Sequence, residues 1–258
     1  AVLAKGKTII QNAAVEPEII DLIKMLNKMG AIIEIDARRV TIEGVDHLRG
    51  VTHSILPDRN EAVSFACLAA ASGGKIFVED AQQEHLITFL SAFRRAGGEY
   101  EVQDNGILFY SGGQLKAVDI KTEPHPGFMT DWQQPFAVLM TQADGTSTIH
   151  ETIYEDRFGY AADLNLMGAR ITVLKECVGH SACRFQKSGF QHSAQVFGPT
   201  PLCGANLQVR DLRAGIAHVI AALVAEGKSV LDGIEELDRG YEKIDERLQK
   251  LGANIIRK

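Results

Sequence analysis

Apolar and polar positions follow one order four times along this chain. Each copy has a glycine turn leading into a short apolar strand, then an amphipathic helix, then a second glycine turn leading into another strand. The glycines before the strands are Gly6, Gly74, Gly145 and Gly227, and those after the helices are Gly30, Gly97, Gly168 and Gly252. The two glycines of a copy lie 24, 23, 23 and 25 residues apart. A spacing this constant indicates repeated structural units.

The second, third and fourth copies carry an additional helix before the first glycine. In the second copy, Asp58 is predicted to cap a helix over 60–71, Glu61 to complete a capping box, and Asn105-Gly106 to turn a hairpin. The other helices of units three and four are predicted near Asp131, Asp156, Asp211 and Asp238. This order predicts an α/β fold of βαβαββ-type units, each with a mixed four-stranded sheet and two helices.

Three predicted helices are apolar nearly all round. They cover 66–71, 136–140 and 216–224. A helix without a polar face is typical of a buried position, so these three are expected to pack against one another.

The repeats also predict how the chain is divided. Residues 1–56 are expected to be the last unit of a first lobe that is otherwise missing, because the chain begins only a few residues before its first glycine. Residues 57–258 are expected to form a second lobe of three units, at 57–122, 123–205 and 206–258. The longest irregular stretch, 175–205, departs from the repeat.

Composition narrows the function classes. Hydrophobic residues make up 45% of the chain, charged residues 23%, and the net charge is −6. No secretory signal or membrane-spanning apolar run is evident, and the four cysteines show no small-domain disulfide pattern. A cytoplasmic location is therefore expected. The acidity disfavours a nucleic-acid-binding protein, which would carry a basic surface.

Positive charge recurs where helices are predicted to begin. Such placement is unfavourable because it meets the positive end of the helix dipole. The arginines concerned are Arg59, Arg157, Arg213 and Arg239, each one or two residues after an aspartate. If the units converge on one face, these arginines and the helix N-termini would bind a phosphate or carboxylate.

Simpler interpretations exist for several of these residues. Aspartates in this position are good helix caps. Arg59 is interpreted as forming only a surface pair with its neighbouring aspartate. For Asp131, Asp211, Arg213 and Arg239, the flanking residues favour a functional site instead.

Four segments in fixed order carry that prediction. They are His125-Pro126-Gly127-Phe128-Met129-Thr130-Asp131-Trp132-Gln133, Glu151-Thr152-Ile153-Tyr154-Glu155-Asp156-Arg157-Phe158, Asp211-Leu212-Arg213-Ala214 and Leu237-Asp238-Arg239-Gly240-Tyr241-Glu242. In order and spacing they resemble the UDP-N-acetylglucosamine 1-carboxyvinyltransferases, a family of enolpyruvyl transferases that opens bacterial peptidoglycan synthesis. The related transferases acting on shikimate 3-phosphate would share the repeats but not the residue patterns of the first and last segments.

The resemblance implies a fold and a reaction. The fold is an inside-out α/β barrel of six units in two lobes, with the active site between the lobes. The reaction moves the enolpyruvyl group of phosphoenolpyruvate onto the 3-hydroxyl of UDP-N-acetylglucosamine and releases phosphate. Neither a metal nor an organic cofactor is implied.

The resemblance also implies roles for particular residues. Asp131 and Asp211 are expected to be catalytic, Asp131 as the general base and Asp211 as the group that orients the phosphoenolpyruvate end. Asp131, Ile153, Arg157, Arg213 and Arg239 are expected to bind substrate, Ile153 through its backbone. The family's lysine, further arginine and loop nucleophile lie in the first lobe, so the chain is expected to supply one wall of the site and to be inactive alone.

Alternative interpretations stay open. The chain could be a half-length protein that binds a nucleotide sugar or a partner without catalysis, or a relative of RNA 3′-phosphate cyclase, although its acidity fits the latter badly. A homo-oligomer is also left open. Finally, Cys177, His180, Cys183 and His192 gather within 175–205 and could bind zinc, but their spacing is not a common zinc motif, and the expectation is no metal.

Overall fold

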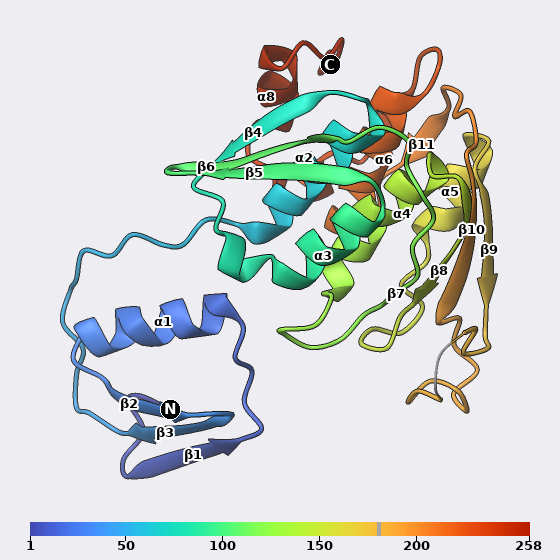
Figure 1. Ribbon diagram of the computed structural model, residues 1–258. Helices are drawn as coiled ribbons and strands as arrows, with labels where there is room; N and C mark the ends of the chain where they lie inside the picture. Colours follow the sequence, from blue (N-terminus) through green and yellow to red (C-terminus); the bar gives the residue numbers. More distant parts are fainter. Residues whose placement is uncertain (180–181) are drawn as a thin grey trace. The chain divides into compact units, whose positions relative to one another are not determined.

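The computed structural model describes residues 1–179 and 182–258. The chain divides into two compact units, Ala1–Pro57 and Asp58–Lys258. Figure 1 labels most of the helices and strands of each unit. Within the described residues, no helix has the length and apolar character needed to cross a membrane.

The first unit is a three-stranded sheet with one helix. Its elements are β1 (Lys7–Gln11), α1 (Pro17–Lys28), β2 (Ile32–Asp36) and β3 (Arg39–Glu43). The antiparallel order is β1-β3-β2, and the buried residues are Ala13, Ala31, Ile33, Val40 and Ile42. The Asn27 side chain exchanges two 3.0 Å hydrogen bonds with the backbone of Ile33, which fastens the end of α1 to β2.

The second unit holds the remaining elements. The first third contains α2 (Arg59–Ala71), β4 (Lys75–Glu79), η1 (Gln83–His85), α3 (Ile87–Arg95), β5 (Gly98–Gln103) and β6 (Gly106–Ser111). The middle contains β7 (Ile120–Lys121), η2 (Thr130–Trp132), α4 (Gln133–Thr141), β8 (Gly145–His150), α5 (Tyr160–Leu166), β9 (Arg170–Leu174) and β10 (Ser193–Gly198). The last third contains β11 (Asn206–Gln208), α6 (Leu212–Val224), β12 (Val230–Asp232), α7 (Glu235–Asp238) and α8 (Ile244–Lys250).

The strands of the second unit form three open sheets. Their orders are β4-β6-β5, β7-β8-β10-β9 and β11-β12. The prediction of four strands in every unit is therefore correct only for the middle one. The hairpin at Asn105-Gly106 is confirmed: Gly106 has a φ of 152°, and a Cβ there would lie 2.2 Å from the carbonyl oxygen of Val78, so only glycine fits.

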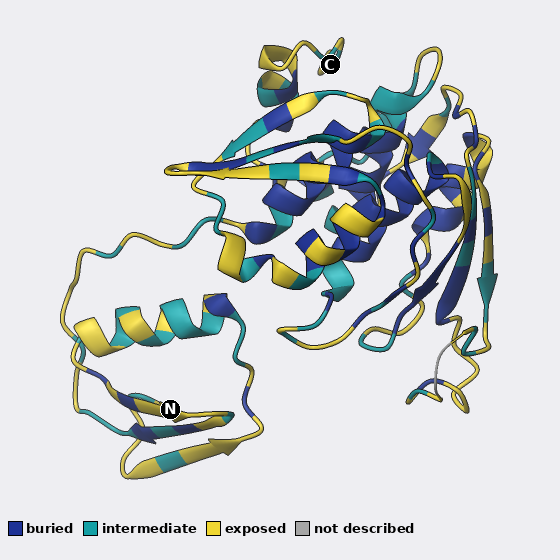
Figure 2. Cartoon of the chain, in the orientation of Figure 1, coloured by how far each residue is buried: buried dark blue, intermediate teal, exposed yellow. Residues whose placement is uncertain are grey.

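Helices α2, α4 and α6 pack on one another at the centre of the second unit, as the apolar pattern predicted. Figure 2 shows all three as almost wholly buried, with the sheets outside them. This arrangement matches the expected fold class, with helices inside and sheets outside, although the described strands do not close into a barrel. Aromatic rings fill one end of the helix packing, where Phe128 contacts Trp132 and Phe136 at centroid distances of 5.5 and 5.4 Å.

Two predicted helices begin later than expected. The helix predicted from Asp156 begins at Tyr160, because Asp156 has a left-handed φ of 48° and its carboxylate accepts a hydrogen bond from the backbone of Gln191. The helix predicted from Asp238 begins at Ile244, after Lys243 with a φ of 47°. Asp238 instead pairs with Arg257 and ends the short helix α7.

The predicted capping box is half right. Asp58 does cap α2, accepting a 2.7 Å hydrogen bond from the backbone of Asn60. Glu61, however, forms a two-pronged ion pair with Arg247 of α8, at 2.8 and 2.6 Å. A doubly bonded guanidinium is a stronger partner than the backbone N–H of a capping box, which explains the difference.

The central packing predicts the cost of an enlarged side chain. Ala137 of α4 is fully buried among the three helices, so Ala137→Leu should lower the free energy of unfolding by about 1–3 kcal/mol through overpacking. Ala162→Leu, at an exposed position of α5, is the matched control and should change little. Urea unfolding of both variants measures the difference. Equal stabilities would contradict a tightly packed helical centre.

Candidate functional site

The carboxylate of Asp131 is the centre of the candidate site. Asp131 lies in η2, the 3₁₀ turn that leads into α4. Its Oδ1 accepts a 2.6 Å hydrogen bond from the Arg157 guanidinium, and its Oδ2 lies 3.2 Å from Nε of Arg213. The side chains are exposed by 26%, 18% and 14% respectively, so the cluster lies at the surface while remaining largely shielded. Two of the four arginines that were expected to share one face, Arg157 and Arg213, thus contact one aspartate.

Arg213 sits in the first turn of α6, where a cation opposes the helix dipole. Asp211 offsets this effect, since its Oδ1 accepts hydrogen bonds from the backbone N–H groups of Arg213 and Ala214, at 2.9 and 3.0 Å. The Arg213 guanidinium also donates to the hydroxyl of Tyr241 at 3.3 Å. Burial lowers the pKa of Arg213, but the neighbouring Tyr241 and Asp131 outweigh it, and the pKa ends above its ordinary value.

Tyr241 was not assigned a role from the sequence, although it lies within the fourth motif. It is fully buried, and its hydroxyl lies 2.9 Å from Oγ of Ser64 in α2 as well as against Arg213. Burial is the main cause that raises the pKa of the Tyr241 hydroxyl, so it stays protonated. Tyr241 therefore fixes the position of Arg213.

Arg157 approaches Asp131 from the loop before α5. Its guanidinium lies over the ring of Tyr154, 4.8 Å from the ring centroid. Because α5 begins only at Tyr160, the predicted helix-terminal position of Arg157 is wrong, although its approach to Asp131 fits a role in the site.

Arg239 is placed differently from the prediction. It follows α7 instead of beginning a helix, and its side chain is 71% exposed. The guanidinium bonds Glu236 at 2.6 Å. The acidic run 235–238 explains this outcome, because it offers a local partner one turn away.

Arg59 is also placed differently, since it is buried and not at the surface. Its guanidinium lies 3.2 Å from Nδ1 of His125 and 5.6 Å from the ring centroid of Trp132. Both contacts come from the first motif. The local aspartate alone does not explain this position, because the central helix packing encloses the start of α2.

No role was predicted for Glu151 from the sequence, although it is the first residue of the second motif. It follows β8 directly and is fully buried. Its Oε2 accepts from the side chains of Thr130 and Gln133, at 2.7 and 2.6 Å. Its Oε1 accepts from the Thr122 hydroxyl and the backbone N–H groups of Ile153 and Tyr154, at 2.8, 2.6 and 3.0 Å. One carboxylate therefore joins β8, the loop after β7, η2 and α4.

Ile153 has both of its backbone polar groups engaged by this network. Its N–H donates to Glu151, and its carbonyl accepts from Arg184. Next to it, Tyr160 donates its hydroxyl to Gln133 at 3.0 Å, and burial raises the pKa of that hydroxyl, with Glu151 adding to the effect. The backbone of Ile153 is thus held in a defined position beside η2.

The cluster is suited to bind an anion beside a proton acceptor. A guanidinium carries five N–H donors, so the contacts of Arg157 and Arg213 described above use part of their capacity. Planar guanidinium groups match carboxylate and phosphate geometry. Asp131 is the carboxylate between them that could accept a proton from a hydroxyl.

Metal-ligating side chains gather elsewhere, at the end of the four-stranded sheet. They are His150, Cys177, Cys183 and His192, whose ligand atoms lie within 4.8 Å of one another. Three of them belong to the predicted quartet. The fourth predicted member, His180, lies outside the described residues, and His150 was not foreseen because it is far away in the sequence.

Loss of the Glu151 carboxylate should unfold the site. Glu151→Gln replaces one acceptor oxygen with a donor that faces other donors, so we expect a loss on the order of 1–3 kcal/mol for each buried donor left unsatisfied. Glu123→Gln, on an exposed glutamate in the same region, is the matched control. Urea denaturation measures both. A Glu151→Gln protein as stable as the control would refute the role given to this carboxylate.

Comparison with known proteins shows the family of this chain. Residues 1–248 match the family model of EPSP synthase (3-phosphoshikimate 1-carboxyvinyltransferase). UDP-N-acetylglucosamine 1-carboxyvinyltransferase of Protochlamydia amoebophila is 49% identical over 256 residues, covering 98% of this chain and 55% of that protein. UDP-N-acetylglucosamine 1-carboxyvinyltransferase 2 of Listeria monocytogenes is 44% identical, covering 100% of this chain and 57% of that protein. The chain therefore spans little more than half the length of the relatives it matches.

Solved structures show the same fold. The enolpyruvyl transferase NikO from Streptomyces tendae superposes with a TM-score of 0.84 at 26% identity, over 98% of this chain and 57% of that one. EPSP synthase from Acinetobacter baumannii superposes with a TM-score of 0.70 at 16% identity, over 96% of this chain and 57% of that one, which bears on the fold alone.

Proposed function

The chain belongs to the EPSP synthase (3-phosphoshikimate 1-carboxyvinyltransferase) family, and on that basis we propose that it supplies one wall of an active site for enolpyruvyl transfer. The group moves from phosphoenolpyruvate to the 3-hydroxyl of UDP-N-acetylglucosamine, in the synthesis of peptidoglycan precursors. The names of relatives at 44–49% identity support the choice of acceptor. The single observation that carries the proposal is the Asp131 carboxylate between Arg157 and Arg213.

Asp131 is the group that would take the proton. As the sugar oxygen bonds to C2 of phosphoenolpyruvate, the hydroxyl proton passes to Asp131, the double bond between C2 and C3 opens, and C3 takes up a proton. Loss of a proton from C3 then restores the double bond while the bond between C2 and the phosphate oxygen breaks and phosphate leaves. Each anionic substrate group binds other N–H donors of the same two guanidinium groups and draws them toward itself. Substrate binding would thus loosen the contacts of Asp131 and leave a carboxylate oxygen for the hydroxyl.

The other residues divide into binding and positioning groups. Arg213 and Arg157 bind the phosphate or carboxylate of phosphoenolpyruvate through fork-shaped donors. Asp211 acts through Arg213, because it caps the helix that carries this arginine. Ile153 binds the nucleotide sugar through its carbonyl oxygen, which retains a second acceptor site beside its bond from Arg184. Arg239 joins the site when its guanidinium leaves Glu236.

The first experiment tests the reaction. Phosphate release should be absent from the chain alone, because the remaining groups of the site lie in a first lobe. It should appear in a chimera that joins this chain to the part of the Protochlamydia relative that the chain does not cover. In the chimera, Asp131→Asn should lower kcat by about 10²- to 10⁴-fold.

Two outcomes would contradict the proposal. Substrate-dependent phosphate release by the chain alone, abolished by Asp131→Asn, would show that no second lobe is required. A folded chimera that binds UDP-N-acetylglucosamine but transfers nothing would favour the alternative of a non-catalytic binding module. Arg94→Ala, an exposed arginine that lies over Tyr100, is the control that should leave kcat unchanged.

The second experiment tests the anion site without catalysis. Inorganic phosphate is titrated into the chain by NMR or calorimetry. Arg213→Ala should abolish binding, and Arg239→Ala should weaken it. Glu236→Gln should strengthen it, because this change removes the acid that competes for Arg239. Equal binding by wild type and Arg213→Ala would sink the assignment, and no effect of either change at 236 or 239 would remove Arg239 from the site.

A further inference from the structure

Two thiols and two imidazoles lie together at one end of the four-stranded sheet. We propose that His150, Cys177, Cys183 and His192 form a structural zinc site. This site would fasten the segment between β9 and β10 to the end of the sheet. The proposal replaces the expectation of no metal and does not depend on the proposed enzymatic function.

Sheet topology brings the four residues together. His150 is the last residue of β8, and its backbone partner in the ladder is Ser193, the first residue of β10. His192 directly precedes Ser193. Cys177 follows the end of β9, whose last residue, Leu174, also pairs with Ser193. Because β8, β10 and β9 are antiparallel neighbours, these positions lie at the same end of the sheet. Cys183, in the loop between β9 and β10, lies beside them.

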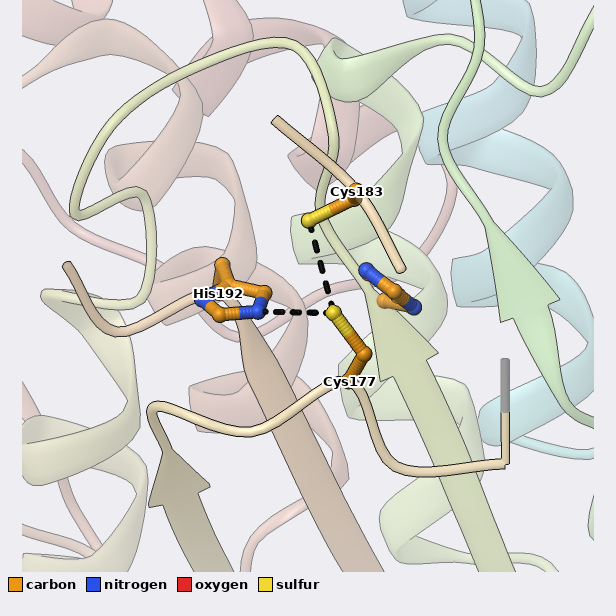
Figure 3. A group of neighbouring side chains, drawn as sticks. Cys177, Cys183 and His192 are labelled. Carbon is orange, nitrogen blue, oxygen red and sulfur yellow. Dashed lines mark hydrogen bonds between the residues drawn. The ribbon is translucent and has the colours of Figure 1, made fainter. Parts of the chain in front are cut away.

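Two distances among three of the ligand atoms match those of tetrahedral zinc, and all four ligand atoms lie within 4.8 Å of one another. Sγ of Cys177 lies 3.6 Å from Sγ of Cys183 and 3.3 Å from Nε2 of His192, and Figure 3 shows these three groups facing one another. Zinc bonds of about 2.3 Å to sulfur and about 2.0 Å to nitrogen place two tetrahedral sulfurs about 3.8 Å apart and sulfur and nitrogen about 3.5 Å apart. The observed distances are within a few tenths of an ångström of both values.

Neighbouring backbone groups orient two of the ligands, His192 and Cys183, for metal binding. Nδ1 of His192 lies 2.9 Å from the carbonyl oxygen of Phe190, so this nitrogen donates and leaves Nε2 as the acceptor that faces Cys177. Histidine ligands of metals almost always make such a second bond. The backbone N–H of Phe185 lies 3.4 Å from Sγ of Cys183, a contact that stabilises a thiolate. The buried ring of Phe185 packs against the imidazole of His192.

The chemistry of the set selects zinc and a structural role. Two thiolates and two imidazoles in a tetrahedron are typical of zinc. Four protein ligands leave no position for a substrate, which distinguishes structural from catalytic sites. A disulfide does not fit, because its sulfurs would be about 2.0 Å apart. His150 and His192 are fully buried, whereas the two cysteines are partly exposed, which gives an ion access from the loop side.

The first test is metal content. The whole chain is purified under reducing conditions, incubated with zinc sulfate, and dialysed. We expect about one zinc per chain by mass spectrometry of the metal. Cys177→Ser and His192→Ala should each lose at least nine-tenths of that zinc, whereas Cys203→Ser and His85→Ala, which alter residues outside the cluster, should retain it. Cobalt(II) in place of zinc should give intense visible bands and a near-ultraviolet thiolate charge-transfer band.

A second measurement avoids dependence on variants that fail to fold. Removing zinc from the wild-type chain with a chelator should lower Tm, and adding zinc back should restore it. Wild-type chain with less than a tenth of an equivalent of zinc after loading, or a Cys177–Cys183 disulfide in the reduced preparation, would overturn the proposal. So would equal zinc loss from Cys203→Ser, or an unchanged Tm after zinc removal.

Discussion

The buried carboxylate of Glu151 is the interaction on which the candidate site depends. An ionisable group inside a protein is tolerated when hydrogen bonds replace its lost hydration, and Glu151 receives five of them from four segments. Those donors belong to η2 and α4, which present Asp131, and to the turn after β8, which presents Ile153. The relative positions of the proposed general base and the proposed nucleotide contact are thereby set by one buried side chain.

A second constraint is the placement of arginine at the start of α6. The helix dipole disfavours Arg213 there, and the surroundings compensate with the cap from Asp211 and the carboxylate of Asp131. Because Asp131 lies outside α6, its contact holds the Arg213 guanidinium at a defined position beside η2. Arg239 differs from Arg213, because it forms an ion pair with Glu236, three residues away, and its side chain remains mostly exposed. Local acids thus decide which arginine contacts Asp131 in this chain.

The sequence predicted what depends on periodicity and on turn chemistry. The packing of the three apolar helices and the hairpin at Gly106 follow from such local patterns. Contacts between residues far apart in the sequence were not predicted. Glu61 was assigned to a capping box because Arg247 is 186 residues away, and His150 was left out of the metal cluster because only the ladder between β8 and β10 brings it near His192. The predicted helix starts at Asp156 and Asp238 were wrong for the same reason. Each aspartate accepts a hydrogen bond from a residue far along the chain, Gln191 and Arg257 respectively.

The pair between Glu61 and Arg247 has a consequence for how the chain folds during synthesis. Together with the bond between Ser64 and Tyr241, it joins the first helix of the second unit to its last one. Contacts of such long sequence separation form slowly, because a large loop must close before they add stability. While the ribosome still holds the residues around Tyr241 and Arg247, Tyr241 cannot reach Ser64 or steady Arg213. The contacts that position Arg213 would therefore be completed only after this last part of the second unit has left the ribosome.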